Sequence, residues 1–333
     1  MLLLTLAAAC GLHAQEWQLV QREVYLMGTQ ALVAAYAPDR VTGLAALESG
    51  VAAIERTEAR LSTWRPDSAV SQLNHAEINR TWHADRDVCR LFVDLHTWYE
   101  RTSGTFDPTV GALAAAWQIQ AGGRVPEEAE LRSARAVTGM KLLPLDRQAC
   151  TLTRTAEVIV DVGAFGKGEA LDEVARVLDD RAWIVDLGGQ VAVGGVPPDG
   201  NPWVVDVAHP VDRARAVMHL EMRSGSVATS GGSERDSFLG ATRIGHILDP
   251  RSGRPATFNG SVVVWHERGL VADILSTALY VMGPEEGLQW AERHEIAAAY
   301  LMPTTHGVAT AETALFRAAK ERGFGFRRDK RGD

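Results

Sequence analysis

The segment AWIVDLGG at residues 182–189 decides the fold class of this 333-residue chain. Its apolar, β-branched first half predicts a strand, and Gly188 and Gly189 predict that the strand ends in a tight turn or beside a second backbone. Further strands are expected at residues 203–207, 216–222 and 261–265, with turns between them. Because strands that follow one another through turns favour an antiparallel meander, we predict an α+β fold, with mainly antiparallel sheets and packed helices, rather than a doubly wound sheet.

The other elements are predicted from periodicity and turn signals. Upstream strands are expected at residues 17–25, 30–36 and 157–160. Helices are expected at residues 43–61, 88–102, 126–138, 168–181, 273–282 and 284–293, with a stop and restart at Gly283-Pro284. The Gly- and Pro-rich residues 194–202 are interpreted as a hairpin loop. We therefore predict one functional domain over residues 16–326, as a single unit or as two intimate subdomains.

Composition and charge argue against nucleic acid as a partner. The formal net charge is -8, and 46% of the residues are hydrophobic, which is enough for a large core. The one basic cluster lies at the end of the chain, in residues 327–333. We expect it to be a solvated, frayed tail.

The N-terminal sequence indicates export. MLLLTLAAACGLHA at residues 1–14 is too short to cross a bilayer, but it fits an export signal over residues 1–15, although the usual basic start is missing. AAAC at residues 7–10 resembles a bacterial lipobox, in which Cys10 becomes lipidated; cleavage after Ala14 is the alternative. We favour the lipobox and expect a protein of the bacterial periplasm or cell surface, anchored to the membrane by lipid if Cys10 is modified.

Two cysteines remain in the mature chain, Cys89 and Cys150. They could form a disulfide in an oxidising compartment, but the sequence has no CxxC pair and no metal-ligand spacing. We therefore expect two separate thiols.

A glycine-rich segment, DVGAFGKGEALD at residues 161–172, predicts an anion site. A strand end, a tight turn and a helix from about Gly168 would present free backbone N–H groups and a helix dipole to a phosphate, beside the Lys167 ammonium. The segment matches neither the P-loop nor the Rossmann glycine spacing. The alternative is a plain turn with a surface lysine.

The segment ADILSTALYVM at residues 272–282 predicts a mostly apolar helix that carries Asp273 and Thr277. These two residues are four positions apart, so on a helix they share a face. Their oxygens could cap or bond the helix locally. Alternatively, they present two hard oxygens to Mg²⁺, with phosphates and waters completing the coordination shell. A magnesium ion beside a phosphate-binding turn would suit pyrophosphate chemistry.

Two further segments carry candidate site residues. In GHILDPRSG at residues 245–253, His246 stands at a strand end and is a general base, a phosphate ligand or a surface histidine. In STWRPDS at residues 62–68, Trp64 offers a stacking ring on a rigid turn, or belongs to a capped loop. The sequence contains no GxSxG, HExxH or kinase motif, so hydrolase and metalloprotease functions have little support.

Taken in order, these motifs resemble the ApbE family of FAD:protein FMN transferases. The matching segments are MGT (27–29), STWRPDS (62–68), TSGTFDPTVG (102–111), DVGAFGKGEALD (161–172), DLGG (186–189), ATSG (228–231), GHILDPRSG (245–253) and ADILSTAL (272–279). They run through nearly the whole mature chain, and Trp64 stands where the family often has Tyr.

The resemblance implies an ApbE-like flavin transferase fold and a Mg²⁺-dependent enzyme. Such an enzyme transfers FMN from FAD to a Thr or Ser hydroxyl of an acceptor protein, here expected to be a membrane redox subunit, and releases AMP. By resemblance, His246 is the catalytic base, and Mg²⁺ is held by Asp273, Thr277 and the carbonyl of Ala164. The residues implied in FAD binding are Met27, Thr29, Trp64, Asp107, Lys167, Gly189, Thr229 and His246.

Three other functions stay open from the sequence. One is a metal-dependent FAD pyrophosphatase that gives FMN and AMP with water as the acceptor. The second is a non-enzymatic flavin-binding lipoprotein. The third is a structural lipoprotein with a vestigial site.

The segment DSFLGAT at residues 236–242 resembles the motif at which acceptor proteins of the family are flavinylated. Thr242 is therefore a candidate for modification by the enzyme itself. The alternative, which we favour, is a hairpin with its turn at Gly240, in which Thr242 starts the strand leading to His246.

Overall fold

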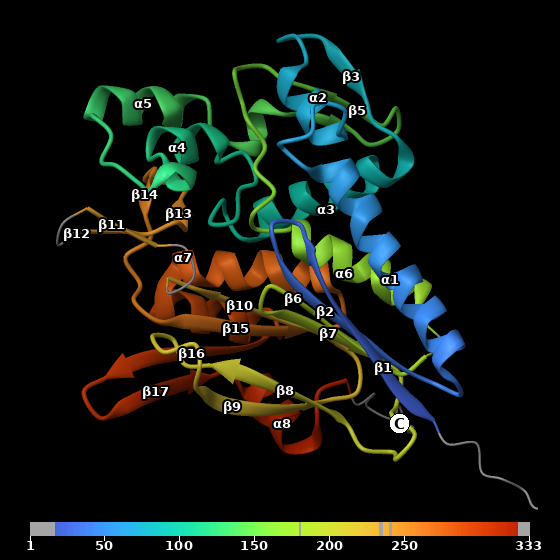
Figure 1. The fold of residues 1–333 in the computed structure, drawn as a ribbon. Helices are drawn as coiled ribbons and strands as arrows, with labels where there is room; N and C mark the ends of the chain where they lie inside the picture. Colours follow the sequence, from blue (N-terminus) through green and yellow to red (C-terminus); the bar gives the residue numbers. More distant parts are fainter. Residues whose placement is uncertain (1–16, 180, 233–235, 240–241, 326–333) are drawn as a thin grey trace, which may run out of the picture.

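The computed structural model describes residues 17–179, 181–232, 236–239 and 242–325. The expected export signal at residues 1–15, with Cys10, and the basic tail at residues 327–333 lie outside the described residues. At the centre is an eight-stranded sheet in which every neighbouring pair is antiparallel (Figure 1). In spatial order its strands are β1 (Gln18–Leu26), β2 (Thr29–Ala37), β6 (Trp183–Leu187), β7 (Gln190–Gly194), β10 (Gly225–Gly231), β15 (Ser261–His266), β16 (Ala297–Thr304) and β17 (Gly307–Glu312).

Helices and smaller sheets surround the central sheet. The helices are α1 (Arg40–Leu61), α2 (Ala69–His75), α3 (Arg86–Arg101), α4 (Gly111–Ala116), α5 (Glu128–Ala136), α6 (Gly166–Val177), α7 (Gly269–Arg293) and α8 (Ala314–Arg322), with short 3-10 turns η1 (Ile119–Ala121) and η2 (Met140–Leu142). The smaller sheets pair β8 (Trp203–Ala208) with β9 (Ala216–Met222), β11 (Ser237–Leu239) with β12 (Thr242–Ile244), β13 (Leu248–Asp249) with β14 (Arg254–Pro255), and β5 (Thr151–Thr153) with both β3 (Thr81–His83) and β4 (Leu145–Asp146). No helix in the described part of the chain is both long and apolar enough to cross a bilayer.

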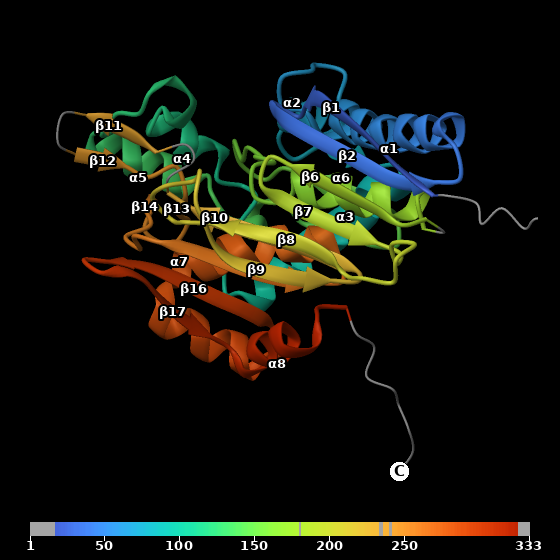
Figure 2. The same cartoon turned by 60° about the horizontal axis from the view of Figure 1, so that its bottom comes forward.

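The central sheet is covered on both faces, which makes a three-layer core (Figures 1 and 2). On one face, α1 and α6 bury side chains such as Leu47 and Val174 against Val33 of β2, and α7 packs beside them. On the other face, the β8–β9 hairpin and α8 bury Val205 and Phe316 against the sheet. Because both faces are covered, the ends of α6 and α7 are held firmly where they meet the strands.

Helix α7 confirms the predicted stop and restart. Gly283 has φ 76° and ψ 174°, so two helical segments meet there at a kink, and Pro284 begins the second. Only a residue that tolerates positive φ fits this position, and proline is favoured in the first turn that follows.

The meander is confirmed at its start and wrong in its middle. β6 ends in the expected tight turn at Gly188 and Gly189, and β7, a strand that was not predicted, runs back beside it with Leu187 opposite Gln190. The hairpin expected at residues 194–202 is wrong, because β7 pairs with β6 and β10 while β8 pairs with β9. Alternate residues of β8 are buried from Trp203 onward, so this hairpin lays one apolar face on the central sheet instead of joining its edge.

The strand expected at residues 157–160 is also wrong. Val158 and Val160 are buried, which explains the apolar pattern, but the segment makes only a single isolated bridge between Ile159 and Val110. The Asn74 side chain instead bonds both backbone groups of Val160, at 2.8 and 2.9 Å. A side chain from α2 thus supplies the hydrogen bonds that a neighbouring strand would otherwise provide.

The expectation of two separate thiols is wrong, because Cys89 and Cys150 form a disulfide with their Cα atoms 5.4 Å apart. It joins the first turn of α3 to the turn between β4 and β5. The two residues are 61 positions apart, and their proximity arises only from the packing of α3 against this small sheet.

Candidate functional site

A cavity of about 610 Å³ opens where strand ends of the central sheet meet the N-terminal turns of α6 and α7. Nine of the predicted site residues line it: Met27, Trp64, Asp107, Ala164, Lys167, Thr229, His246, Asp273 and Thr277. They come from segments spread along the chain from Met27 to Thr277. The fold therefore gathers the scattered motifs into one site of the size used for small-molecule ligands.

Two predicted FAD-binding residues, Thr29 and Gly189, lie just behind this lining. Their neighbours Gly28 and Gly188 line the cavity instead. Gly188 has φ 60°, and a Cβ there would lie 2.6 Å from Thr29 Oγ1. The Gly189 N–H donates to Asp186 Oδ1 at 2.8 Å. Thr29 and Gly189 thus shape two facing turns at the cavity wall, and the close approach requires glycine at position 188.

Asp273 lies at the base of the cavity and is 4% exposed. Its Oδ2 accepts a hydrogen bond from the backbone N–H of Gly168 at 3.0 Å, and its Oδ1 lies 3.5 Å from Lys167 Nζ. The first turn of α6 therefore faces a carboxylate of its own chain as well as the cavity. Asp273 belongs to the interior of α7, which begins at Gly269, so it is not the local cap considered from the sequence.

Hydroxyl groups extend this polar base along α7. Ser230 Oγ of β10 lies 3.3 Å from Thr277 Oγ1 and 2.8 Å from Ser276 Oγ. The Ser276 hydroxyl in turn donates to the Asp273 carbonyl at 3.0 Å. Ser230 and Ser276 were not predicted as site residues, although both lie inside motifs already quoted from the sequence. Their role became visible only when β10 was placed beside α7.

The donor set fits a hard cation such as Mg²⁺. It combines the buried carboxylate of Asp273, the hydroxyl of Thr277 and the carbonyl of Ala164 in one cavity. No cluster of three or more His, Cys, Asp or Glu side chains suited to a metal is found among the described residues. A magnesium ion here would thus depend on few protein oxygens, with ligand phosphates and water supplying the others, as this ion usually does.

Asp107 is a second buried carboxyl group in the wall of the cavity. Burial raises its pKa to about 6, against hydrogen bonds from the Thr109 N–H at 2.8 Å and the Thr109 hydroxyl at 2.5 Å. The Thr109 hydroxyl also accepts from the Gly139 N–H at 2.7 Å. Asp107 is therefore held rigidly and changes charge near neutral pH.

The side chain of His246 is partly buried, whereas that of Trp64 is exposed to solvent. His246 follows β12, as predicted, and its Nδ1 lies 2.8 Å from Asp236 Oδ1. Trp64 is 78% exposed in the turn between α1 and α2, where Ser68 caps α2 by accepting from the Ser71 N–H. The capped loop and the cavity-lining ring are thus both present, and the Trp64 ring is free to stack on a ligand.

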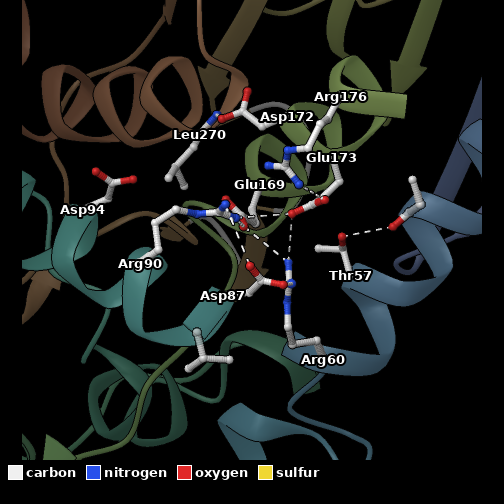
Figure 3. A network of polar contacts seen from close by, with 12 residues as sticks. Thr57, Arg60, Asp87, Arg90, Asp94, Glu169, Asp172, Glu173, Arg176 and Leu270 are labelled. Atoms are coloured by element: carbon white, nitrogen blue, oxygen red, sulfur yellow. Dashed lines mark hydrogen bonds and ion pairs between the residues drawn. The ribbon is translucent and has the colours of Figure 1, made fainter. Parts of the chain in front are cut away.

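A buried charge network supports the first turn of α6 from behind (Figure 3). Glu169 is 3% exposed and faces Arg60 of α1 at 3.3 Å and Arg90 of α3 at 3.5 Å. Burial raises the pKa of Glu169 to about 7, although both guanidinium groups act in the opposite direction. One turn later, the Asp172 carboxylate accepts from the backbone N–H groups of Gly269 and Leu270. Asp172 therefore caps α7 from α6 and fixes the helix that carries Asp273.

The ApbE family model matches residues 27–301 of this chain. The chain belongs to the ApbE family. A "FAD:protein FMN transferase" of Klebsiella pneumoniae (strain 342) is 30% identical over 306 residues, covering 87% of this chain and 86% of that protein. The same name belongs to a protein of Vibrio cholerae that is 29% identical over 79% of this chain and 81% of its own length.

Solved structures of ApbE proteins share the fold. The apo form of the Pseudomonas stutzeri flavinyl transferase ApbE superposes with a TM-score of 0.81 at 28% identity, covering 91% of this chain and 97% of that one. The flavin transferase ApbE of Vibrio cholerae gives a TM-score of 0.79 at 27% identity, over 91% and 99%. The predicted α+β flavin transferase fold is thereby confirmed.

Some lining residues of this ApbE-family site were not predicted. Glu58, Asp161 and Gln190 add two carboxylates and an amide to the cavity wall. The amide of Gln190 is buried and donates to the Gly269 carbonyl at 2.9 Å, so it ties β7 to the start of α7. Gln190 follows directly after the DLGG segment, and this position was the one signal that could have identified it.

Proposed function

We propose that this chain transfers FMN from FAD to a Thr or Ser hydroxyl of an acceptor protein and releases AMP. The observation that carries the proposal is the convergence of Asp273, Lys167 and His246 on one cavity in a chain of the ApbE family. A cation site, a fixed positive charge and a base are the groups that attack on a pyrophosphate requires.

The position of each residue in the cavity indicates its role in the reaction. The Lys167 ammonium and the positive end of the α6 dipole attract the negative charge of the pyrophosphate. His246 takes the proton of the acceptor hydroxyl, whose oxygen bonds to the phosphorus of the FMN half. The bond from that phosphorus to the oxygen of the AMP half breaks, and AMP leaves with both electrons. Trp64, Met27 and Asp107 bind and orient FAD in the cavity.

We further propose that Mg²⁺ is held by Asp273, Thr277 and the Ala164 carbonyl. When bound, it offsets the negative charge that develops on the pyrophosphate oxygens. Lys167 contributes to the same charge balance, because its ammonium group lies 3.5 Å from the carboxylate that would hold the ion.

The test uses the purified chain with FAD, Mg²⁺ and candidate membrane redox subunits, followed by in-gel flavin fluorescence and quantification of AMP. Labelled acceptor with one AMP released per label supports the transferase. Release of FMN and AMP in equal amounts without labelled acceptor identifies an FAD pyrophosphatase. Binding of FAD without AMP release identifies a flavin-binding protein. The last two outcomes both overturn the proposal.

We propose that the protein works outside the cytoplasm, anchored by lipid at Cys10. Two observations support this location: the lipobox-like residues 7–10 and the disulfide between Cys89 and Cys150, which is typical of oxidising compartments. Cys10→Ser should move the protein from the membrane fraction to the soluble exported fraction. An unchanged membrane fraction would rule out the lipid anchor.

Self-modification at Thr242 stays a prediction. The structure confirms the alternative hairpin, because β12 begins at Thr242, which pairs with Leu239 of β11. Gly240, the expected turn residue, lies outside the described residues. Intact-mass measurement after incubation with FAD and Mg²⁺ tests the modification, because an added FMN that is absent from Thr242→Val would establish it.

A further inference from the structure

One carboxylate oxygen fixes both the ring and the backbone of His246. Asp236 Oδ1 lies 2.8 Å from His246 Nδ1 and accepts from the His246 backbone N–H at 2.9 Å. The Asp236 side chain is 4% exposed. It precedes β11, and the β11–β12 hairpin brings it beside a residue ten positions later. The orientation of the His246 ring in the cavity is thus fixed by Asp236 as well as by the turn that follows β12.

The second oxygen of Asp236 is held by the Nε of Arg243 in β12. Arg243 is itself held by Asn259 Oδ1 at 2.9 Å. A Cβ at Gly232 would overlap the Arg243 guanidinium and the second Asp236 oxygen, so this glycine leaves room for the pair. The carboxylate therefore has partners on both oxygens and little freedom to rotate.

The charge of Asp236 is maintained in this pocket. Burial acts to raise the pKa of Asp236, but the hydrogen bonds from His246 and the contact with Arg243 outweigh it and leave the pKa below its ordinary value. A carboxylate that stays ionised can only accept hydrogen bonds. The proton of the neutral imidazole must then lie on Nδ1, and the lone pair on Nε2.

We propose that Asp236 is a positioning residue that holds His246 in the Nδ1–H tautomer, with Nε2 as the atom that receives the acceptor proton. This inference rests on the proposed function. In the part of the chain that the structure describes, the Nε2 atom has no hydrogen-bond partner, while His246 lines the cavity. When the acceptor hydroxyl gives its proton to Nε2, the imidazolium is stabilised by the adjacent carboxylate. The leaving AMP phosphate or water then accepts the proton from Nε2.

A second Asp–His pair in the same chain provides a matched control. Asp206 of β8 and His219 of β9 approach at 2.6 Å between Oδ1 and Nδ1. Both side chains are exposed, and neither lines the cavity. Asp206→Asn therefore makes the same chemical change to a histidine partner without touching the site.

The experiment measures tautomer and turnover separately. Nitrogen-15 NMR of the chain labelled at histidine, without FAD, should show Nδ1–H for His246 in the wild type and a shift toward Nε2–H in Asp236→Asn. At saturating FAD, Asp236→Asn should lower the transfer rate by about 10- to 100-fold or more, with the dissociation constant of FAD changed less than about twofold. Asp236→Glu, which keeps the charge, should recover part of the rate. Asp206→Asn should change neither readout.

The outcomes separate this inference from the proposed function. An Nε2–H tautomer in the wild type overturns the inference without any variant, so it stays testable even if Asp236→Asn does not fold. A normal rate in a folded Asp236→Asn overturns it as well. If the wild type labels no acceptor and releases no AMP, the proposed function fails, while the tautomer still decides whether Asp236 positions His246.

Discussion

The backbone N–H of Gly168 in α6 donates a hydrogen bond to the Asp273 carboxylate of α7, 3.0 Å away. The two helices meet backbone to backbone at this point, because a Cβ on Gly168 would overlap the carbonyl oxygen of Gly269. Asp172 adds a second link by capping α7 at Gly269. The Asp273 carboxylate of the proposed cation site is therefore positioned by contacts between the N-terminal turns of α6 and α7, and not only by its rotamer preference.

Removing the charge of Asp273 should abolish FMN transfer. Asp273→Asn keeps an oxygen for the Gly168 N–H but removes the anion that faces Lys167. We expect a loss of at least about 100-fold in transfer rate, comparable to the loss of a group that stabilises transition-state charge. Titration calorimetry with Mg²⁺ alone should show weakened binding in the same variant.

The control for this prediction is Thr277, whose neutral oxygen water can replace. Thr277→Ala should reduce the rate less than Asp273→Asn, and Thr277→Ser should leave it nearly unchanged. Both helices must remain folded, which thermal melting checks. Full activity of Asp273→Asn after removal of metal and resupply of Mg²⁺ would contradict the assignment.

Asp107 should make the stability of the ligand-free protein depend on pH. Its pKa is raised from 3.8 to about 6 in the folded state, because burial disfavours the charged form. The native state therefore binds this proton more tightly than the unfolded chain does. The contribution of Asp107 to the free energy of unfolding is highest below about pH 4 and falls by up to about 3 kcal/mol as the pH rises past about 6.

The measurement compares urea unfolding of the wild type and Asp107→Asn between about pH 4 and about pH 7. An Asn side chain can still accept from Thr109, whose N–H lies 2.8 Å from Oδ1, but it does not titrate. As the pH rises, the free energy of unfolding of Asp107→Asn should increase relative to that of the wild type. If the unfolding free energies of the two proteins change in parallel with pH, the pKa of Asp107 is not raised in the folded state.

The disulfide between Cys89 and Cys150 should stabilise the fold. It closes a long loop that contains α3, α4 and α5, so reduction releases conformational entropy of the unfolded chain. We expect a reducing agent to lower the free energy of unfolding by about 2–5 kcal/mol. Guanidinium unfolding with and without reductant measures this loss. The double variant Cys89→Ser, Cys150→Ser should have the unfolding free energy of the reduced wild type, and reductant should not change it. A change with reductant in this variant would show that the effect does not come from this disulfide.

Residues that act within one segment were predictable from the sequence, and residues that meet across segments were not. The shared face of Asp273 and Thr277 follows from helical spacing alone. Trp64 and Lys167 lie in short motifs, and the structure places both at the cavity. The partner of His246 is ten positions away across a hairpin whose register had to be known first. Cys89 and Cys150 meet only because α3 packs on a small sheet, which no periodicity describes.

The errors in the fold have the same origin. The β8 segment has the alternation of a strand, and it is one, but alternation does not say which sheet it joins. Residues 158–160 are apolar, and Val158 and Val160 are buried, while the backbone of Val160 is bonded by the Asn74 side chain of α2. The sequence pattern thus reflected burial in both places, but it did not identify the hydrogen-bond partners.

Gly168→Ala should damage the site by forcing α6 and α7 apart. The new Cβ would overlap the Gly269 carbonyl. Because this contact is with backbone atoms, it can be relieved only by moving one of the two helices, which costs stability. We expect a loss of about 1–3 kcal/mol in the free energy of unfolding, as for other overpacked contacts. The shift should also disturb Asp273 and lower FMN transfer. Gly50→Ala in α1 is the matched control, because its Cβ would meet Val33 Cγ1 at 3.4 Å, an ordinary contact.

Gly50→Ala should leave transfer unchanged and stabilise the protein by up to about 1 kcal/mol, because alanine replaces glycine inside a helix. Urea unfolding and the in-gel flavin assay on the two variants give the comparison. If Gly168→Ala is as stable and as active as Gly50→Ala, the contact with Gly269 does not position Asp273. If it is stable but inactive, the contact matters for the site and not for the fold. Loss of both, with Gly50→Ala intact, is the result that the packing of Gly168 against Gly269 predicts.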